Sequence, residues 1–144
     1  MTVVIIRLLL DFGLVVLIWI IQRIVYPSFL HYSTENLVVW HREYTSRFSA
    51  IVIPLMLAQL GISIYQVITF ANLYTVLSLV IIILVWASTF LQFVPIHSNI
   101  SKGSVSEKML KTLVRKNWLR TFLWSLLFVI NFGYYILNTF NYQN

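Results

Sequence analysis

Four long apolar runs divide this chain, covering residues 3–26, 48–70, 73–94 and 118–137. Each run is close to the roughly 20 residues that an α-helix needs to cross the hydrocarbon core of a bilayer. Hydrophobic residues make up 60% of the sequence and charged residues only 10%, which leaves too little polar surface to cover a soluble globule of this size. We therefore expect an all-α integral membrane protein, a four-helix bundle whose main partner is the lipid bilayer.

The length of the chain leaves little room for anything besides these four spans. With 144 residues and no linker or low-complexity tract, residues 1–144 are expected to form a single transmembrane domain. The absence of cysteine excludes disulfides, thiolate catalysis and thiolate metal sites. The first run is too long for a signal-peptide core, and no small-x-small cleavage site follows it, so we expect it to stay on the protein.

The net charge of +6 is concentrated around the connection between the third and fourth runs. Only Glu107 opposes the basic residues there, and the Ala71-Asn72 turn carries no charge. By the positive-inside rule this connection is cytoplasmic, as is the first one, and both termini are non-cytoplasmic in the cell inner membrane. The basic residues lack the interleaved aromatic and polar groups of a nucleic-acid surface, which excludes that partner. They are Lys102, Lys108, Lys111, Arg115, Lys116 and Arg120.

Local signals predict where the helices begin and end. Ser33-Thr34-Glu35-Asn36 is a helix start, and Ser104-Val105-Ser106-Glu107 is a capping box that predicts a fourth helix from about Val105. Helices two and four would then extend a few turns beyond the bilayer into the cytoplasm. The third helix is expected to stop near Val94-Pro95, and the first to stop or kink at Tyr26-Pro27, because proline cannot extend the hydrogen-bond ladder.

The three histidines of the chain all belong to the cytoplasmic membrane face. His31 follows the first apolar run, His41 lies on the apolar stripe of helix two, and His97 follows Pro95. Asn117 lies on the core side of helix four, with Arg120 one turn further on. We therefore expect His41 and His97 to lie near each other at the cytoplasmic mouth of the bundle, with Asn117 and Arg120 close by.

Polar residues inside the apolar runs cost free energy in lipid, so they should face one another or a hydrated cavity. The set comprises Gln22, Arg23, Gln59, Ser88, Thr89, Gln92 and Asn131. Arg7 and Asp11 are four residues apart near the opposite surface and are expected to pair along the first helix. Together these residues outline a polar lining that opens toward the histidine face.

An enzyme site at this mouth would need a base or ligand, a proton path and an apolar pocket. The candidate catalytic residues are His41, His97, Tyr44, Asn117 and Arg120. Residues expected to contact a cofactor are Gln92, Tyr26 and Gln59. A metal would draw on His31, His41 and His97, although no His-x-x-x-His spacing places two ligands on one helix. Haem is less expected than a metal, because no histidine lies within an apolar run.

Several short motifs together resemble a family of small bacterial four-span membrane proteins, those similar to the anthrone-oxygenase-like domain of unknown function. The motifs are Tyr26-Pro27-x-Phe29, Trp40-His41-x-x-Tyr44, Pro54-x-Met56-x-x-Gln59, Gln92-x-x-Pro95-x-His97 and Asn117-Trp118-x-Arg120-Thr121. In that family a Pro-x-His or Pro-x-Asn element leaves helix three and an Asn-x-x-Arg element opens helix four. The resemblance implies a four-span fold and, by analogy only, redox or oxygenase chemistry on an apolar substrate.

Two other classes of function fit the same sequence. A small transporter or channel would use the buried polar residues as a pathway and would need a homo-oligomer to build it. Against this class, Asp11 is the only acidic residue in a span, and the two halves of the chain show no internal repeat. An accessory subunit of a membrane complex is equally compatible with the residues.

Overall fold

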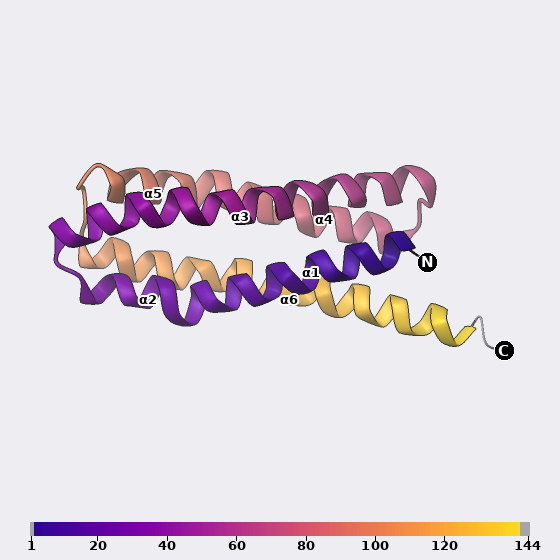
Figure 1. Cartoon of the computed structure of the whole chain (residues 1–144). Helices are drawn as coiled ribbons and strands as arrows, with labels where there is room; N and C mark the ends of the chain where they lie inside the picture. The colour runs from indigo at the N-terminus through magenta and orange to yellow at the C-terminus, as the bar shows by residue number, and fades with distance from the viewer. Residues whose placement is uncertain (1, 142–144) are drawn as a thin grey trace.

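The computed structural model describes residues 2–141, and all regular structure in that range is helical (Figure 1). Four long helices follow one another, and each is long and apolar enough to cross a membrane. The predicted all-helical class and the four apolar helices are thus confirmed. Two of the long helices are unbroken: α3 runs over Thr34–Thr69 and α6 over Glu107–Asn141.

The other two long helices each contain a stretch of wider π-helix. The first consists of α1 (Thr2–Ile20), the π turn η1 (Ile21–Val25), α2 (Tyr26–Ser28) and the 3-10 turn η2 (Phe29–His31). The third consists of α4 (Leu73–Ser88), the π turn η3 (Thr89–Phe93) and α5 (Val94–Ser101).

The long helices run up and down in a closed ring (Figure 1). α3 packs against α1 and α4, and α6 packs against the same two helices from the other side, so sequential helices are neighbours. One end of the bundle holds the η2–α3 and α5–α6 connections, and we call it the histidine end. The opposite end holds the two termini and the α3–α4 turn (Figure 1), and we call it the terminal end.

The exterior of the bundle is apolar over most of its length. Large side chains such as Leu9, Ile68 and Leu91 project outward with exposed fractions of 66, 80 and 77%. Contiguous exposed apolar surface on this scale is unfavourable in water but is what hydrocarbon requires. The core between the helices mixes apolar side chains such as Leu14, Ile82 and Leu127 with buried polar groups.

Both prolines that were expected to end helices are accommodated by a π turn instead. The expected stop of the third helix at Val94-Pro95 is wrong, because α5 continues to Ser101. Likewise, the first helix continues past Pro27 to His31. In each case the proline comes two residues after a π turn, whose widened ladder carries the chain past a residue that has no N–H and would clash in a regular α-helix.

The connection between α5 and α6 also differs from the expected capping box. α5 ends in a Schellman turn, in which Gly103 has φ +82° and Ser104 N–H donates to the Asn99 carbonyl over 3.0 Å. α6 begins at Glu107, two residues later than predicted. Its cap is Ser106, whose Oγ accepts from Met109 N–H at 3.2 Å. Ser104 is drawn into the end of the preceding helix and therefore cannot serve as the cap.

The predicted start of α3 is confirmed, since Ser33 Oγ accepts from Asn36 N–H at 3.4 Å. α3 contains 36 residues and is therefore about 54 Å long at ~1.5 Å per residue. This exceeds the roughly 30 Å thickness of the hydrocarbon core of a bilayer.

Replacing the cap of α6 should distinguish the two serines. Ser106→Ala removes the acceptor for Met109 N–H and should lower the free energy of unfolding by about 1 kcal/mol. Ser104→Ala is the matched control and should change it by less than about 0.5 kcal/mol, because only its backbone is used. Reversible unfolding in mixed detergent measures both. A larger loss of unfolding free energy for Ser104→Ala than for Ser106→Ala would support the capping box predicted from the sequence.

Candidate functional site

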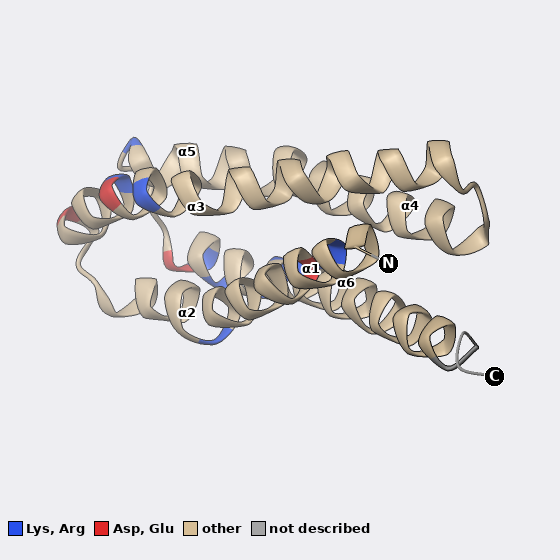
Figure 2. Ribbon diagram, turned by 45° about the vertical axis from the view of Figure 1, so that its right-hand side comes forward, with Lys and Arg blue, Asp and Glu red and all other residues tan. Residues whose placement is uncertain are grey.

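The charged residues of the chain gather at the histidine end of the bundle (Figure 2). Blue and red ribbon is concentrated around the start of α3, the α5–α6 connection and the first half of α6 (Figure 2). The remaining acidic group is Asp11 in α1, beside Arg7. Charged side chains therefore lie mainly in two places, at the histidine end and around Asp11.

Two histidines and a tyrosine form a hydrogen-bonded chain inside the histidine end. His41 Nε2 lies 2.7 Å from His97 Nδ1, and His97 Nε2 lies 2.9 Å from the Tyr26 hydroxyl. His41 Nδ1 lies 3.0 Å from Ser101 Oγ, which completes a chain of four side chains from α2, α3 and α5. The predicted proximity of His41 and His97 is confirmed. We call these four residues the imidazole chain.

Each link of the imidazole chain requires one donor and one acceptor. A neutral imidazole supplies one of each, so two neutral rings satisfy all three links, with the protons pointing toward either end. The rings stack with centroids 4.9 Å apart, and two positive charges at that distance would repel. The arrangement therefore favours at most one positive charge on the two rings.

Arg42 fixes one end of the imidazole chain. Its Nε and Nη2 donate to the Ser101 carbonyl over 3.1 and 2.8 Å. These bonds satisfy a carbonyl that the last turn of α5 leaves without a helical partner. Adjacent residues of α3, His41 and Arg42, therefore hold both the hydroxyl and the carbonyl of Ser101.

A pocket of about 470 Å³ lies beside the imidazole chain, between α3 and the η3–α5 segment, and we call it the histidine pocket. Its polar groups include Tyr26, Tyr44, His97, Ser101 and Arg120, and much of its wall is aromatic and aliphatic. Outward-facing apolar side chains lie among the lining residues, including Ile53, Phe90 and Val94. The pocket is therefore bordered by the apolar exterior of the bundle.

Arg120 is the one cationic side chain that lines this pocket. It is only 5% exposed, and its guanidinium carbon lies 4.3 Å from the Phe93 ring centroid and 5.2 Å from that of Trp124. Its Nε has no hydrogen-bond partner within residues 2–141. The chain has four acidic residues, and none of them lines the pocket. They are Asp11, which pairs with Arg7, Glu43, which pairs with Arg47, Glu107, which pairs with Lys111, and the exposed Glu35.

The structure brings together four of the five candidate catalytic residues. His97, Tyr44 and Arg120 line the pocket, and His41 is bonded to His97. The fifth, Asn117, is buried but points elsewhere: its Nδ2 donates to Gln22 Oε1 over 2.9 Å. Gln22 in turn donates to the Val114 carbonyl over 3.2 Å, so this pair ties the π turn η1 to α6.

The candidate cofactor and metal residues are more dispersed. Of the cofactor set, Tyr26 lines the histidine pocket, Gln92 is half-buried outside its lining, and Gln59 belongs to the cluster described below. His31 is exposed at the end of η2. Within residues 2–139 no group of three His, Asp or Glu side chains is placed to hold a metal ion.

Sequence reasoning missed two features of this site. Ser101 was overlooked because the third helix was expected to stop at Pro95; once α5 continues, Ser101 lies four residues after His97 on the same face. The aromatic cover of Arg120 by Phe93 and Trp124 was also missed. Trp124 is four residues after Arg120 in α6, so the helical spacing did contain a signal for that contact.

A second buried polar group lies toward the terminal end, and we call it the Asp11 cluster. Arg7 Nε donates to both Asp11 oxygens over 3.0 and 3.1 Å, which confirms the predicted pair. Both side chains are completely buried in the bundle. Gln59 Nε2 donates to Asp11 over 2.6 Å, Asn131 also donates to Asp11, and Arg7 Nη1 donates to Gln66 over 3.1 Å. Side chains of α1, α3 and α6 therefore share this ion pair.

No protein-family model, curated protein or solved structure matches the chain. The resemblance to anthrone-oxygenase-like proteins therefore stays a prediction from short motifs.

Removing one partner of the buried Arg7–Asp11 ion pair should strongly destabilise the fold. Asp11→Ala leaves the buried Arg7 guanidinium without a countercharge and should lower the free energy of unfolding by about 3–5 kcal/mol. Glu43→Ala, which breaks the exposed pair with Arg47, is the matched control and should cost about 1 kcal/mol or less. Unfolding in mixed detergent compares them. Equal effects would mean that water reaches Arg7.

Proposed function

We propose that the protein binds an apolar small molecule with an acidic oxygen group in the histidine pocket, and that the imidazole chain exchanges a proton with it. The observation that carries the proposal is Arg120, a buried cation without an acidic partner in a pocket with apolar walls. Three features support it: the buried Arg120 guanidinium, the apolar walls of the pocket and the imidazole chain.

The guanidinium supports an anionic or acidic group on the ligand. A buried charge is costly unless it is paired, and the rings of Phe93 and Trp124 compensate only part of that cost. A carboxylate or phenolate would supply the missing countercharge and accept the free Nε–H in a charge-assisted hydrogen bond.

The walls of the pocket support an apolar body for the same ligand. Phe48, Met56 and Trp86 line it deep in the bundle, and Phe90 lies at the outer surface. A molecule dissolved in the bilayer would enter from the side without crossing water. The pocket volume of about 470 Å³ falls within the roughly 300–1,000 Å³ of small-molecule sites.

The imidazole chain supports proton transfer. The Tyr26 hydroxyl lines the pocket and is bonded to His97, so a proton released by a bound phenol or acid would pass through His97 and His41 to Ser101 near the α5–α6 connection. We favour redox or oxygenase chemistry at this site, because oxidation of a phenol or hydroquinone requires a proton acceptor. An optical spectrum and metal analysis of the purified protein would show whether haem, flavin or a metal accompanies the chain.

Transport is the second candidate function. The Asp11 cluster favours it, because a buried carboxylate bonded to several helices is a recurrent part of membrane pathways. Every Asp11 oxygen already accepts hydrogen bonds from the protein, whereas Arg120 retains a free donor. This difference is why we place the ligand at the histidine end.

Loss of the guanidinium should weaken binding of an acid specifically. In lipid nanodiscs, Arg120→Met should bind 2-naphthoic acid about 10- to 100-fold more weakly than the unmodified chain, the loss expected for one charge-assisted hydrogen bond. Naphthalene, which has the same rings without the carboxylate, should bind both alike. Energy transfer from tryptophan to the probe measures binding.

Arg115→Met is the matched control, since Arg115 is exposed on the same helix. It should leave the affinity for 2-naphthoic acid unchanged. Equal affinities of the Arg120 and Arg115 variants, both shown to be folded by their unfolding curves, would contradict the proposal.

The orientation in the membrane follows from the basic residues at the histidine end. We propose that this end faces the cytoplasm, that the overhanging turns of α3 and α6 project there, and that both termini lie on the other side of the cell inner membrane. A reporter active only in the cytoplasm should be active in the 102–106 connection and silent at either terminus. Activity at a terminus would reverse the assignment.

A further inference from the structure

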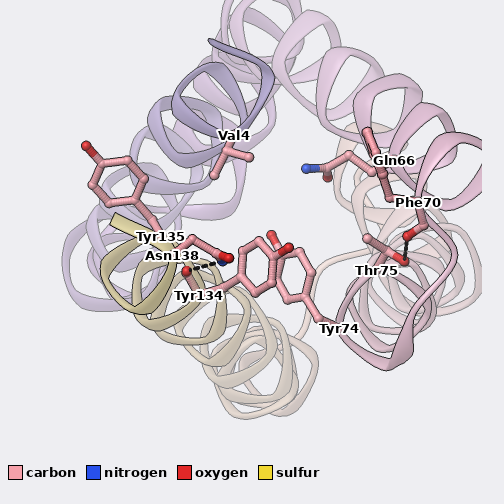
Figure 3. Close-up of a pocket in the computed structure, with 8 residues that line it drawn as sticks. All are labelled: Val4, Gln66, Phe70, Tyr74, Thr75, Tyr134, Tyr135 and Asn138. Atoms are coloured by element: carbon pink, nitrogen blue, oxygen red, sulfur yellow. Dashed lines mark hydrogen bonds between the residues drawn. The ribbon is translucent and has the colours of Figure 1, made fainter. Parts of the chain in front are cut away.

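A second pocket of about 510 Å³ lies at the terminal end, far along the bundle from the histidine pocket, and we call it the tyrosine pocket. It is formed where the end of α3 and the start of α4 meet α6 and the beginning of α1 (Figure 3). Gln66 and Phe70 line one side, Tyr74 another, and Tyr134 and Tyr135 a third. Neither Arg120 nor the imidazole chain takes part in it.

Two buried hydrogen-bond donors at or beside the tyrosine pocket, the Tyr74 hydroxyl and Arg7 Nη2, have no partner among the described residues. Gln66 is nearly completely buried, its Oε1 accepts from Arg7, and its amide nitrogen points into the open space (Figure 3). The buried Tyr74 hydroxyl has no hydrogen-bond partner among the described residues. Arg7 Nη2, directly behind Gln66, is completely buried and is also without a partner in that part of the chain. The missing component is an acceptor.

The charge at this end is already balanced, unlike that at the histidine end. Arg7 Nε donates to both oxygens of Asp11, so the pair carries no net charge. Asp11 also accepts from Gln59 and Asn131, which leaves the carboxylate occupied by the protein. An incoming anion would find no free countercharge, whereas an uncharged oxygen could accept from the amide of Gln66 and the hydroxyl of Tyr74.

The remaining surface of the pocket is aromatic. The rings of Tyr74 and Tyr134 stack with centroids 3.8 Å apart and planes 2° from parallel (Figure 3). Phe70 and the ring of Tyr135 add further apolar area. Such walls suit an apolar or ring-containing body, while the amide of Gln66 and the phenol of Tyr74 fix its polar end.

We propose that the tyrosine pocket is a second binding site, for an uncharged apolar molecule that presents a carbonyl oxygen to Gln66 and Tyr74. The site is independent of the acid site at the histidine end. Two sources supply this chemistry, a free ketone or quinone and the ester carbonyl of a membrane lipid, and the experiment below separates them.

Benzophenone tests the site, because its carbonyl is both a hydrogen-bond acceptor and, under near-ultraviolet light, a cross-linker. In nanodiscs, mass spectrometry should find the label on peptides that contain Phe70, Tyr74 and Tyr134. Tyr74→Phe, which keeps the ring stack and removes the hydroxyl, should reduce this labelling about 3- to 10-fold at limiting probe, the loss expected for one neutral hydrogen bond. Tyr65→Phe, an exposed tyrosine of α3, is the matched control and should leave it unchanged.

Competitors and lipids complete the experiment. Fluorenone should suppress the labelling and fluorene, which lacks the carbonyl, should not. Stronger labelling in ether-linked than in ester-linked phosphatidylcholine would assign the natural occupant to lipid esters, and equal labelling would assign it to a free molecule. Labelling that is unchanged by Tyr74→Phe, or suppressed equally by fluorene, would overturn the proposal. Arg120→Met should label as the unmodified chain does, which keeps this outcome separate from that of the acid site.

Discussion

The structure depends on the π turns that precede a proline in the first and third long helices; the remaining proline, Pro54, lies inside α3 without such a turn. In the first and third helices, the π turn inserts one residue, and the side chains that follow are turned by about 100° relative to an uninterrupted α-helix. Tyr26 follows the first π turn and His97 the second, and these two side chains meet. Had the third helix stopped at Pro95, His41 would have no partner across the bundle, because both His97 and Ser101 follow that proline. The wide turns are thus what assembles the site, in agreement with the frequent association of π turns with function.

Much of the fold could be predicted because its signals are local. Long apolar runs identify the four helices, Ser33 is followed by an unambiguous start, and Arg7 and Asp11 have the spacing of a helical pair. The π turns could not be predicted, because the local rule for proline is that it ends a helix. The predicted cap of α6 was wrong for a related reason. Ser104 and Ser106 are both suitable cap residues, and the Schellman turn at Gly103 decides between them. Periodicity placed Asn117 in the core, but it could not name Gln22 as its partner.

The two pockets show how the same kind of residue produces different chemistry. Both are lined by tyrosine, and each has a buried arginine in its lining or bonded to it, yet Arg7 has a carboxylate four residues away on its own helix and Arg120 has two aromatic rings. The first arrangement is neutral and presents donors, while the second retains a positive charge. Sequence position alone does not distinguish them, because the difference lies in which partners the other helices bring.

The hydrogen bonds of the imidazole chain would limit how often it could transfer a proton. When a proton enters a row of neutral rings at one end and another leaves at the far end, every hydrogen bond in the row is left pointing the opposite way. A second transfer in the same direction must wait until both rings have exchanged the nitrogen that carries hydrogen. His41 and His97 are stacked and held at both nitrogens, so neither ring is free to flip. If the imidazole chain transfers protons as proposed, it would deliver them singly, with a resetting step between transfers.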